Sequence, residues 1–298
     1  MWFGQVNALW TEATSPSPPV GTPAAMTRPR TRRWDRMTGP EIGAVDTAGA
    51  LAVVPIGAVE QHGPHLPLVT DSLVAEAVAT RAVAALPDDV EAYVLPTLTI
   101  GKSTEHLGWP GTLSFSTETL LAVCRDVGRS VAASGFRRLV FVNGHGGNPS
   151  LLDTVSRDIR VETGLMVFPV SVFRLGLPEG LPVPDEAFSI HGGYVETSAM
   201  LALAPDDVHL DRAEAGGHAV LDLYADTVHL SLEGAVPTAW VSADVTDNGV
   251  VGDPAGATAE AGAAIVDCWS TRLTEALVEV AAFEFPGRVR AGRVRALG

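Results

Sequence analysis

The sequence predicts an α/β fold in which helices cover both faces of a mostly parallel central sheet. Short apolar runs of strand length alternate along the chain with longer segments whose apolar residues recur at helical spacing. This alternation is typical of parallel sheets, because consecutive parallel strands are joined by crossover helices. The 298 residues, 46% of them hydrophobic, are enough to bury a large core.

The first part of the expected domain contains two strands and a helix. Residues 51–56 form an apolar run of strand length. Residues 71–86 carry apolar side chains at intervals of three and four, which predicts a helix. Residues 92–98 predict the next strand, and a loop follows through residues 101–112.

The same alternation continues downstream. Residues 117–134 have helical spacing, and Thr117 is a suitable N-cap. Residues 138–142 are mainly β-branched and aromatic, which predicts a strand. The remaining expected elements are helices at residues 148–162, 191–203 and 257–282 and a strand at residues 166–172. No internal repeat of fixed period is present.

The two ends of the chain differ in composition from the segment between them. Residues 1–33 are rich in Pro and Ser and include an arginine cluster, so we expect a flexible N-terminal extension. Residues 284–298 contain four arginines and are expected to be a basic tail, either solvated or in a subunit contact. The folded domain is therefore expected over residues 34–283.

The charge of the chain limits its partners. A formal net charge of −15 repels nucleic acid and anionic lipid, so neither is an expected partner. No run of about 18 apolar residues predicts a membrane span. The N-terminus lacks the basic-then-apolar order of a secretory signal, and the two cysteines fit buried thiols in a reducing compartment. A cytoplasmic protein is expected.

A dense group of metal-binding residue types follows the first expected strand. Glu60 and His62 point the same way if the backbone is extended, and Asp71 begins the following helix. Carboxylate oxygens with an imidazole nitrogen suit Zn, Mn or Fe better than Ca or Mg. Because ligands bind beyond the carboxyl ends of parallel strands, a metal site is expected at this edge of the sheet.

Two later segments carry further candidate residues. His145 follows another strand within a glycine-rich stretch, which in isolation could also be a phosphate cradle at a helix start. That stretch lacks the Lys and Ser or Thr of a P-loop. His191 and Glu196 lie in the third segment, where a structural histidine and an ordinary first-turn carboxylate are the alternatives.

Several segments resemble motifs of the creatininase family. Its three signature segments are matched by residues 60–71, 143–148 and 191–198. Residues 105–112 are similar to the family's substrate-side loop, and residues 249–258 to its late turn into the last helix. The five segments occur in the family's order within residues 34–283.

The resemblance implies a layered α/β/α domain that holds two divalent metal ions, Zn, Mn or Fe. It also implies a homo-oligomer, commonly a hexamer. His191 matches the position expected to move a proton, and Asp71 matches the ligand expected to bridge the ions. The metal ligands implied in this way are Glu60, His62, Asp71, His145 and Glu196.

The resemblance also bears on the substrate. Glu105, His106 and Trp109 lie in the segment similar to the substrate-side loop, so they are expected to bind substrate, although each could instead brace or pack this loop. Creatininase itself has a metal-binding Glu two residues after the second-motif His, where this chain has Gly147. Glu196 is the expected replacement. This departure disfavours creatinine as the substrate.

Together these features predict a metal-dependent amidohydrolase. It would cleave a non-standard amide C–N bond in a lactam, a formamide or a modified peptide, through a hydroxide that bridges the metals. His191 would give a proton to the departing nitrogen. The substrate is thus a small molecule or a modified peptide. The alternatives are a non-catalytic metal- or ligand-binding protein on the same fold and a phosphate binder that uses the glycine-rich stretch.

Overall fold

The computed structural model describes residues 31–184 and 188–285. Of the extension expected over residues 1–33, all but the last three residues lie outside these ranges. The same holds for all but the first two residues of the basic tail expected over residues 284–298.

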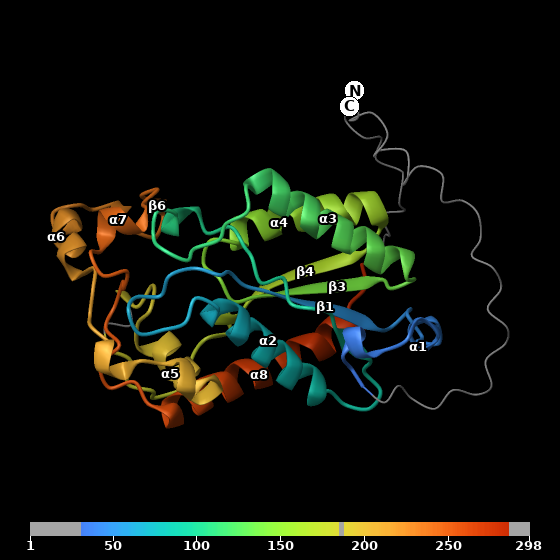
Figure 1. Ribbon diagram of the computed structural model, residues 1–298. Coiled ribbons are helices and arrows are strands. Elements are labelled where there is room, and N and C mark those ends of the chain that lie inside the picture. The colour runs from blue at the N-terminus through green and yellow to red at the C-terminus, as the bar shows by residue number, and fades with distance from the viewer. Residues whose placement is uncertain (1–30, 185–187, 286–298) are drawn as a thin grey trace. The chain divides into compact units, whose positions relative to one another are not determined.

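A four-stranded parallel sheet in the order β2-β1-β3-β4 forms the centre of the domain (Figure 1). Its strands are β1 (Leu51–Ile56), β2 (Ala92–Val94), β3 (Arg138–Asn143) and β4 (Met166–Ser171). Every residue of β1 and β3 is buried, as is typical of strands covered on both faces. Ile56 pairs with Asn143 at the carboxyl ends of these two strands. The loops that follow β1 and β3 therefore start side by side.

Helices cover both faces of this sheet (Figure 1). One face is packed by α2 (Thr70–Ala84), α5 (Tyr194–Leu203) and α8 (Ala259–Ala282), and the other by α3 (Thr117–Ala133) and α4 (Pro149–Thr163). Alternate strand residues enter the two cores, because side chains of a strand point to opposite faces. Val53 and Val140 share a core with Trp269 of α8, whereas Phe141 packs with Leu152 of α4. The predicted three-layer α/β/α fold is confirmed.

The segment between α5 and α8 forms a smaller apolar cluster together with Phe188, which precedes α5. Phe188, Val220 and Val251 are buried in this cluster. Its short elements are α6 (Leu221–Tyr224), β5 (Leu230–Ser231), β6 (Val236–Pro237) and α7 (Ser242–Val245). The sequence patterns predicted none of these elements, nor the short α1 (Gly39–Gly43) ahead of β1, because each is too short to show a period.

The two largest errors in the predicted element boundaries concern one strand and one helix. The strand expected over residues 92–98 ends at Val94, because Pro96 has no N–H with which to continue the ladder. The helix expected over residues 191–203 begins at Tyr194. Residues 191–193 are not part of the helix, because the backbone of His191 pairs with that of Val251.

The predicted helix caps also shift. Ser116, not Thr117, caps α3, since its side chain accepts a hydrogen bond from the Thr119 N–H at 3.2 Å. The last helix begins at Ala259, two residues later than expected, because Thr258 takes the N-cap position. The Thr258 hydroxyl accepts from the backbone N–H of the third helical residue at 3.1 Å.

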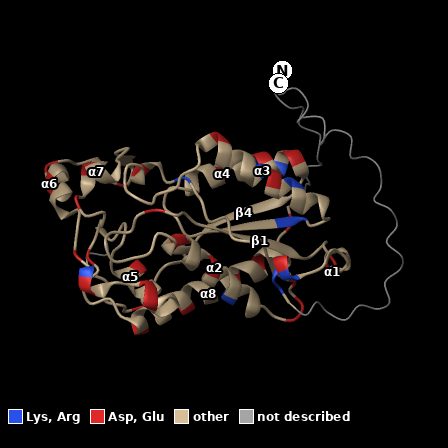
Figure 2. Cartoon of the chain, in the orientation of Figure 1, with Lys and Arg blue, Asp and Glu red and all other residues tan. Residues whose placement is uncertain are grey.

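Acidic side chains outnumber basic ones by 35 to 20 in the whole chain. Figure 2 shows them along the helices of both outer layers. The expectation that nucleic acid and anionic lipid are disfavoured partners stays a prediction. Within the part of the chain that the structure describes, no helix is both long and apolar enough to cross a membrane.

The contact between α5 and α8 generates a stability prediction. A Cβ atom added to Gly262 would collide with the backbone carbonyl of Ser198. Gly262→Ala should therefore lower the free energy of unfolding by about 1–3 kcal/mol. The expected sign is unusual, because replacing Gly by Ala inside a helix ordinarily stabilises the helix by about 1 kcal/mol. Gly43→Ala is the control, because a Cβ atom there has no neighbour within 4 Å. Urea unfolding measures both; a Gly262→Ala variant as stable as the parent would contradict this packing.

Candidate metal centre

The carboxyl ends of β1 and β3 carry a buried cluster of acidic and imidazole side chains. Glu60 and His62 follow β1, and His145 follows β3. Asp71 is the second residue of α2, and Glu196 lies in the first turn of α5. The structure thus brings all five predicted metal ligands to one edge of the sheet, where open α/β sheets bind ligands. Each is at most 9% exposed.

Asp71 lies between two imidazoles. Its Oδ1 atom is 3.0 Å from His62 Nε2, in hydrogen-bond geometry. Its Oδ2 atom is 3.0 Å from His145 Nδ1 but lacks a hydrogen bond of good geometry. The two oxygens of one carboxylate therefore face two different histidines. A carboxylate in this position could offer one oxygen to each of two cations.

Glu60 is the second centre of the cluster. Its Oε1 atom lies 3.3 Å from His145 Nδ1, 3.5 Å from His106 Nε2 and 3.8 Å from His191 Nδ1. Its Oε2 atom is buried and has no hydrogen-bond partner among the described residues. A buried carboxylate oxygen without a partner is costly, and a bound cation would satisfy it.

Glu196 reaches the cluster from α5. Its Oε2 atom accepts a hydrogen bond from the Gly192 N–H at 2.6 Å, which fixes the side chain against its own loop. Its Oε1 atom is 3.9 Å from His62 Nε2. Glu196 thus stands beside the same imidazole nitrogen that faces Asp71.

Main-chain carbonyls orient three of the histidines. His62 Nδ1 donates to Glu60 O at 3.1 Å, His145 Nε2 to Lys102 O at 2.9 Å, and His191 Nε2 to Gln61 O at 2.5 Å. A carbonyl oxygen only accepts, so the proton of each neutral ring lies on the nitrogen that faces it. The opposite nitrogen of each ring, with its lone pair, faces the carboxylates. Such orientation of a ligating histidine by a second partner is typical of metal sites.

The buried charges shift the pKa values of the cluster. Burial lowers the pKa of His62, but the carboxylates of Asp71, Glu196 and Glu60 outweigh it and raise this pKa to about 10. Burial is likewise outweighed at His145, where Glu60 and Asp71 hold the pKa well above its usual value. The carboxylates thus create a strong demand for positive charge between these rings. A divalent cation would meet that demand in place of the protons.

In two other members of the cluster the pKa shift favours the neutral form of the side chain. Burial, with the neighbouring carboxylates of Asp71 and Glu60, raises the pKa of Glu196 to about 7. Burial and the nearby rings of His62 and His106 hold the pKa of His191 well below its usual value. His191 is therefore neutral at neutral pH and can accept a proton at Nδ1.

The donor set fits divalent metal. Candidate ligand atoms lie within 4.8 Å of one another in four overlapping groups: Glu60, His62 and Asp71; Glu60, Glu105 and His145; His62, His191 and Glu196; and Glu60, His106 and His191. Mixed carboxylate and imidazole donors suit Zn, Mn or Fe. The four groups share residues, so the cluster offers several alternative sets of ligands for a divalent ion.

The three predicted substrate-binding residues differ in burial and in their distance from the metal centre. His106 is buried and its ring stacks on that of His191, with centroids 4.1 Å apart. Glu105 is half-buried, and its Oε1 atom lies 3.5 Å from His145 Nε2. Trp109 is partly exposed just after this turn, and no contact of its side chain with the cluster is found in the described ranges.

The sequence reasoning missed two polar residues of the centre. Gln61 lies between two predicted ligands, and its side-chain amide is 2.9 Å from His106 Nδ1. Ser242 at the start of α7 places its hydroxyl 2.6 Å from the same nitrogen. Gln61 could have been found from its place inside the first motif. Ser242 gave no signal, because it follows a long segment without periodicity.

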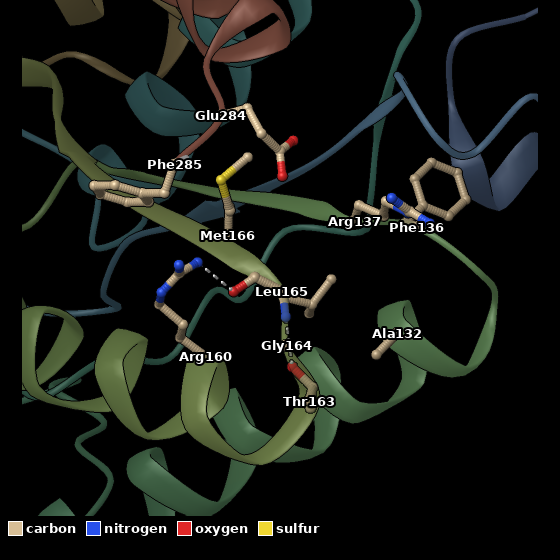
Figure 3. A pocket seen from close by; sticks show the side chains of 10 residues that line it. All are labelled: Ala132, Phe136, Arg137, Arg160, Thr163, Gly164, Leu165, Met166, Glu284 and Phe285. Atoms are coloured by element: carbon tan, nitrogen blue, oxygen red, sulfur yellow. Dashed lines mark hydrogen bonds between the residues drawn. The ribbon is translucent and has the colours of Figure 1, made fainter. Parts of the chain in front are cut away.

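A separate cavity of about 210 Å³ lies near the amino ends of β3 and β4 (Figure 3). Arg137, Leu165 and Met166 line it together with Phe285. The guanidinium of Arg160 sits 5.1 Å from the centre of the Phe285 ring. No histidine lines this cavity, and it is at the opposite end of the strands from the metal centre. The cavity is therefore separate from the metal centre.

Known proteins resemble this chain in sequence. A mycofactocin precursor peptide peptidase from Mycolicibacterium smegmatis is 39% identical over 217 residues, which cover 71% of this chain and 78% of that protein. A creatinine amidohydrolase from Pseudomonas putida is 36% identical over 198 residues, covering 59% of this chain and 73% of that protein.

Solved structures show the same likeness. A Zn–Zn creatininase variant has a TM-score of 0.68 and 27% identity, covering 84% of this chain and 98% of its own. A manganese creatininase has a TM-score of 0.66 and 26% identity with the same coverage. The sequence profile of the creatininase family, described as creatinine amidohydrolase, matches residues 35–277. The chain therefore belongs to the creatininase family.

Proposed function

We propose that this chain is a metal-dependent amidohydrolase that cleaves an amide C–N bond in a peptide precursor. The observation that carries the proposal is the position of Asp71, whose two carboxylate oxygens face His62 and His145 in a buried cluster. In this proposal Glu60, Asp71 and His145 hold one divalent ion, and His62, Asp71 and Glu196 hold the second. When bound, the ions would activate water and polarise the amide carbonyl.

His191 is the proposed proton carrier. Its Nε2–H is held by the Gln61 carbonyl, so its Nδ1 lone pair faces the centre beside Glu60. The lowered pKa of His191 leaves this nitrogen unprotonated at the start of the reaction. The same nitrogen can then return the proton to the departing amine, which is a poor leaving group without it.

The residue at position 147 supports a substrate other than creatinine. A Cβ atom on Gly147 would collide with Lys102 O and with the side chains of Glu105 and His145. A metal-binding glutamate at this position, as in creatininase itself, therefore does not fit this loop. The relatives named as mycofactocin precursor peptide peptidases align over more of the chain than the creatinine amidohydrolase does. We therefore propose a peptide of that kind as the substrate.

A non-catalytic metal-binding protein on the same fold is the rival function. It would bind the ions through the same side chains but leave no coordination position for water or substrate. The relatives support the enzyme over this rival, because those with 36–39% identity are named as a peptide peptidase and a creatinine amidohydrolase.

Loss of the shared carboxylate should abolish metal binding and activity together. Asp71→Ala removes a carboxylate whose two oxygens lie 3.0 Å from His62 and His145, so we expect loss of most bound metal and no measurable hydrolysis. Elemental analysis of the purified protein and a peptide cleavage assay measure both. The control is Asp126→Ala, because Asp126 is exposed on α3. A metal-replete, active Asp71→Ala variant would refute the proposed centre.

Loss of the proton carrier should separate binding from rate. His191→Ala is expected to retain metal at the parent's stoichiometry and to lose about 10²–10⁴-fold in kcat. His229→Ala changes an exposed histidine and should leave both unchanged. If His191→Ala instead loses metal in proportion to activity, His191 is a ligand and not a proton carrier.

Chelation tests the metal and the substrate class together. The parent protein should cleave a mycofactocin precursor peptide, lose this activity on removal of metal, and regain it with Zn or Mn. Creatinine should not be hydrolysed at a comparable rate. Bound metal without turnover of either substrate would favour the non-catalytic rival, and hydrolysis that survives complete chelation would exclude the metal mechanism.

A further inference from the structure

His106 is held differently from the other histidines of the centre. It ends the 3-10 turn Thr104–His106 and is buried, with its ring stacked at 27° on the ring of His191. Its Nε2 atom points towards the metal centre, 3.5 Å from Glu60 Oε1. Its Nδ1 atom faces away from the centre. No main-chain carbonyl holds either nitrogen in the described ranges; side chains of Gln61 and Ser242 face Nδ1 instead.

Two backbone groups fix the amide of Gln61. Its Oε1 atom accepts a hydrogen bond from the Gly63 N–H at 2.9 Å, and its Nε2 atom donates to Gly249 O at 3.0 Å. Exchanging the two ends of the amide would set carbonyl against carbonyl and N–H against N–H, so this orientation is unique. The amide nitrogen therefore lies 2.9 Å from His106 Nδ1 and can only donate to it.

Ser242 adds a second donor to the same atom. Its side chain is fully buried, and its hydroxyl lies 2.6 Å from His106 Nδ1. A hydroxyl can donate or accept, but the amide N–H of Gln61 leaves Nδ1 only the acceptor role. The Ser242 hydroxyl consequently donates too. A proton on His106 Nδ1 would point at these two donors.

The neutral ring of His106 must therefore carry its proton on Nε2. This reverses the pattern of His62, His145 and His191, whose lone pairs face the carboxylates. A histidine that binds metal through Nε2 needs its proton on Nδ1. Glu60, His106 and His191 are close enough together to bind an ion. His106 nevertheless carries its proton on the nitrogen that would have to bind this ion.

From this arrangement we infer that Gln61 and Ser242 are positioning residues that hold His106 with its N–H towards the carboxylates of the centre, the reverse of the three histidines held by main-chain carbonyls. Its Nε2–H points to the space beside Glu60 where, if the proposed function is right, the scissile carbonyl lies. A preorganised donor there stabilises the negative charge that develops on the carbonyl oxygen during hydrolysis. The catalytic role of His106 rests on the proposed function, whereas the position of its proton does not.

Neutron diffraction from crystals of the metal-loaded, deuterium-exchanged protein tests the position of the proton directly. We expect a deuteron on His106 Nε2, none on Nδ1, and no metal ion within bonding distance of either nitrogen. The expected deuterons on His62 Nδ1, His145 Nε2 and His191 Nε2 are internal references. A deuteron on His106 Nδ1, or an ion bound to His106 Nε2, overturns the inference.

Kinetics test the catalytic role of the two positioning residues. Ser242→Ala and Gln61→Met should retain metal and lower kcat for the mycofactocin precursor peptide by about 10–100-fold, with a smaller change in KM. Ser242→Thr keeps the hydroxyl and should recover most of the rate. The control Ser156→Ala removes another buried hydroxyl, one without a hydrogen-bond partner among the described residues, and should act like the parent. Equal losses in Ser242→Ala and Ser242→Thr would contradict positioning through the hydroxyl.

The two measurements separate the possible failures. A parent protein that cleaves no peptide refutes the proposed function, while the neutron map still decides the proton on His106. A cleaving parent with a deuteron on His106 Nδ1 refutes the inference alone. If Ser242→Ala does not fold, the neutron map and Ser242→Thr still test it.

Discussion

The buried carboxylate of Asp71, shared between His62 and His145, is the constraint on which the rest of the centre depends. A carboxylate 2% exposed to solvent is stable only if positive charge or hydrogen-bond donors surround it. Here the nearest partners are imidazoles that are themselves buried and face further carboxylates. While these histidines are neutral, the negative charge of the carboxylates in the cluster has no positive charge to balance it. Divalent metal resolves this imbalance without the need to protonate the ligands.

The parallel sheet makes this arrangement possible. The last residues of β1 and β3 pair with each other, so the two loops that carry the ligands begin side by side. The start of α2 lies directly on these strand ends, because Gly57 and Gly144 have no side chain to hold it away. A Cβ atom on Gly57 would collide with Ser72, and one on Gly144 with the backbone carbonyl of Asp71. Glycine at these two positions is what brings the helix, and with it the shared carboxylate, into the centre.

Much of the fold and part of the site could be predicted from the sequence. The main strands and helices are long enough to show their periodicity, and the motifs of Glu60, His62 and His145 end strands that sit next to each other in the sheet. Ser242 could not be found in this way, since its partner His106 is 136 residues away and the segment around it consists of elements too short to show a period. The roles of the site residues stay predictions, because geometry shows which atoms face each other and not which of them bind metal.

Anomalous X-ray diffraction from metal-loaded crystals, at the absorption edge of the bound metal, tests the shared role of Asp71. We expect two peaks about 3.5–4 Å apart, one on each side of Asp71, with Glu60 and His145 next to one ion and His62 and Glu196 next to the other. A single ion, or a pair of ions to which Asp71 contributes no oxygen, would contradict this shared role.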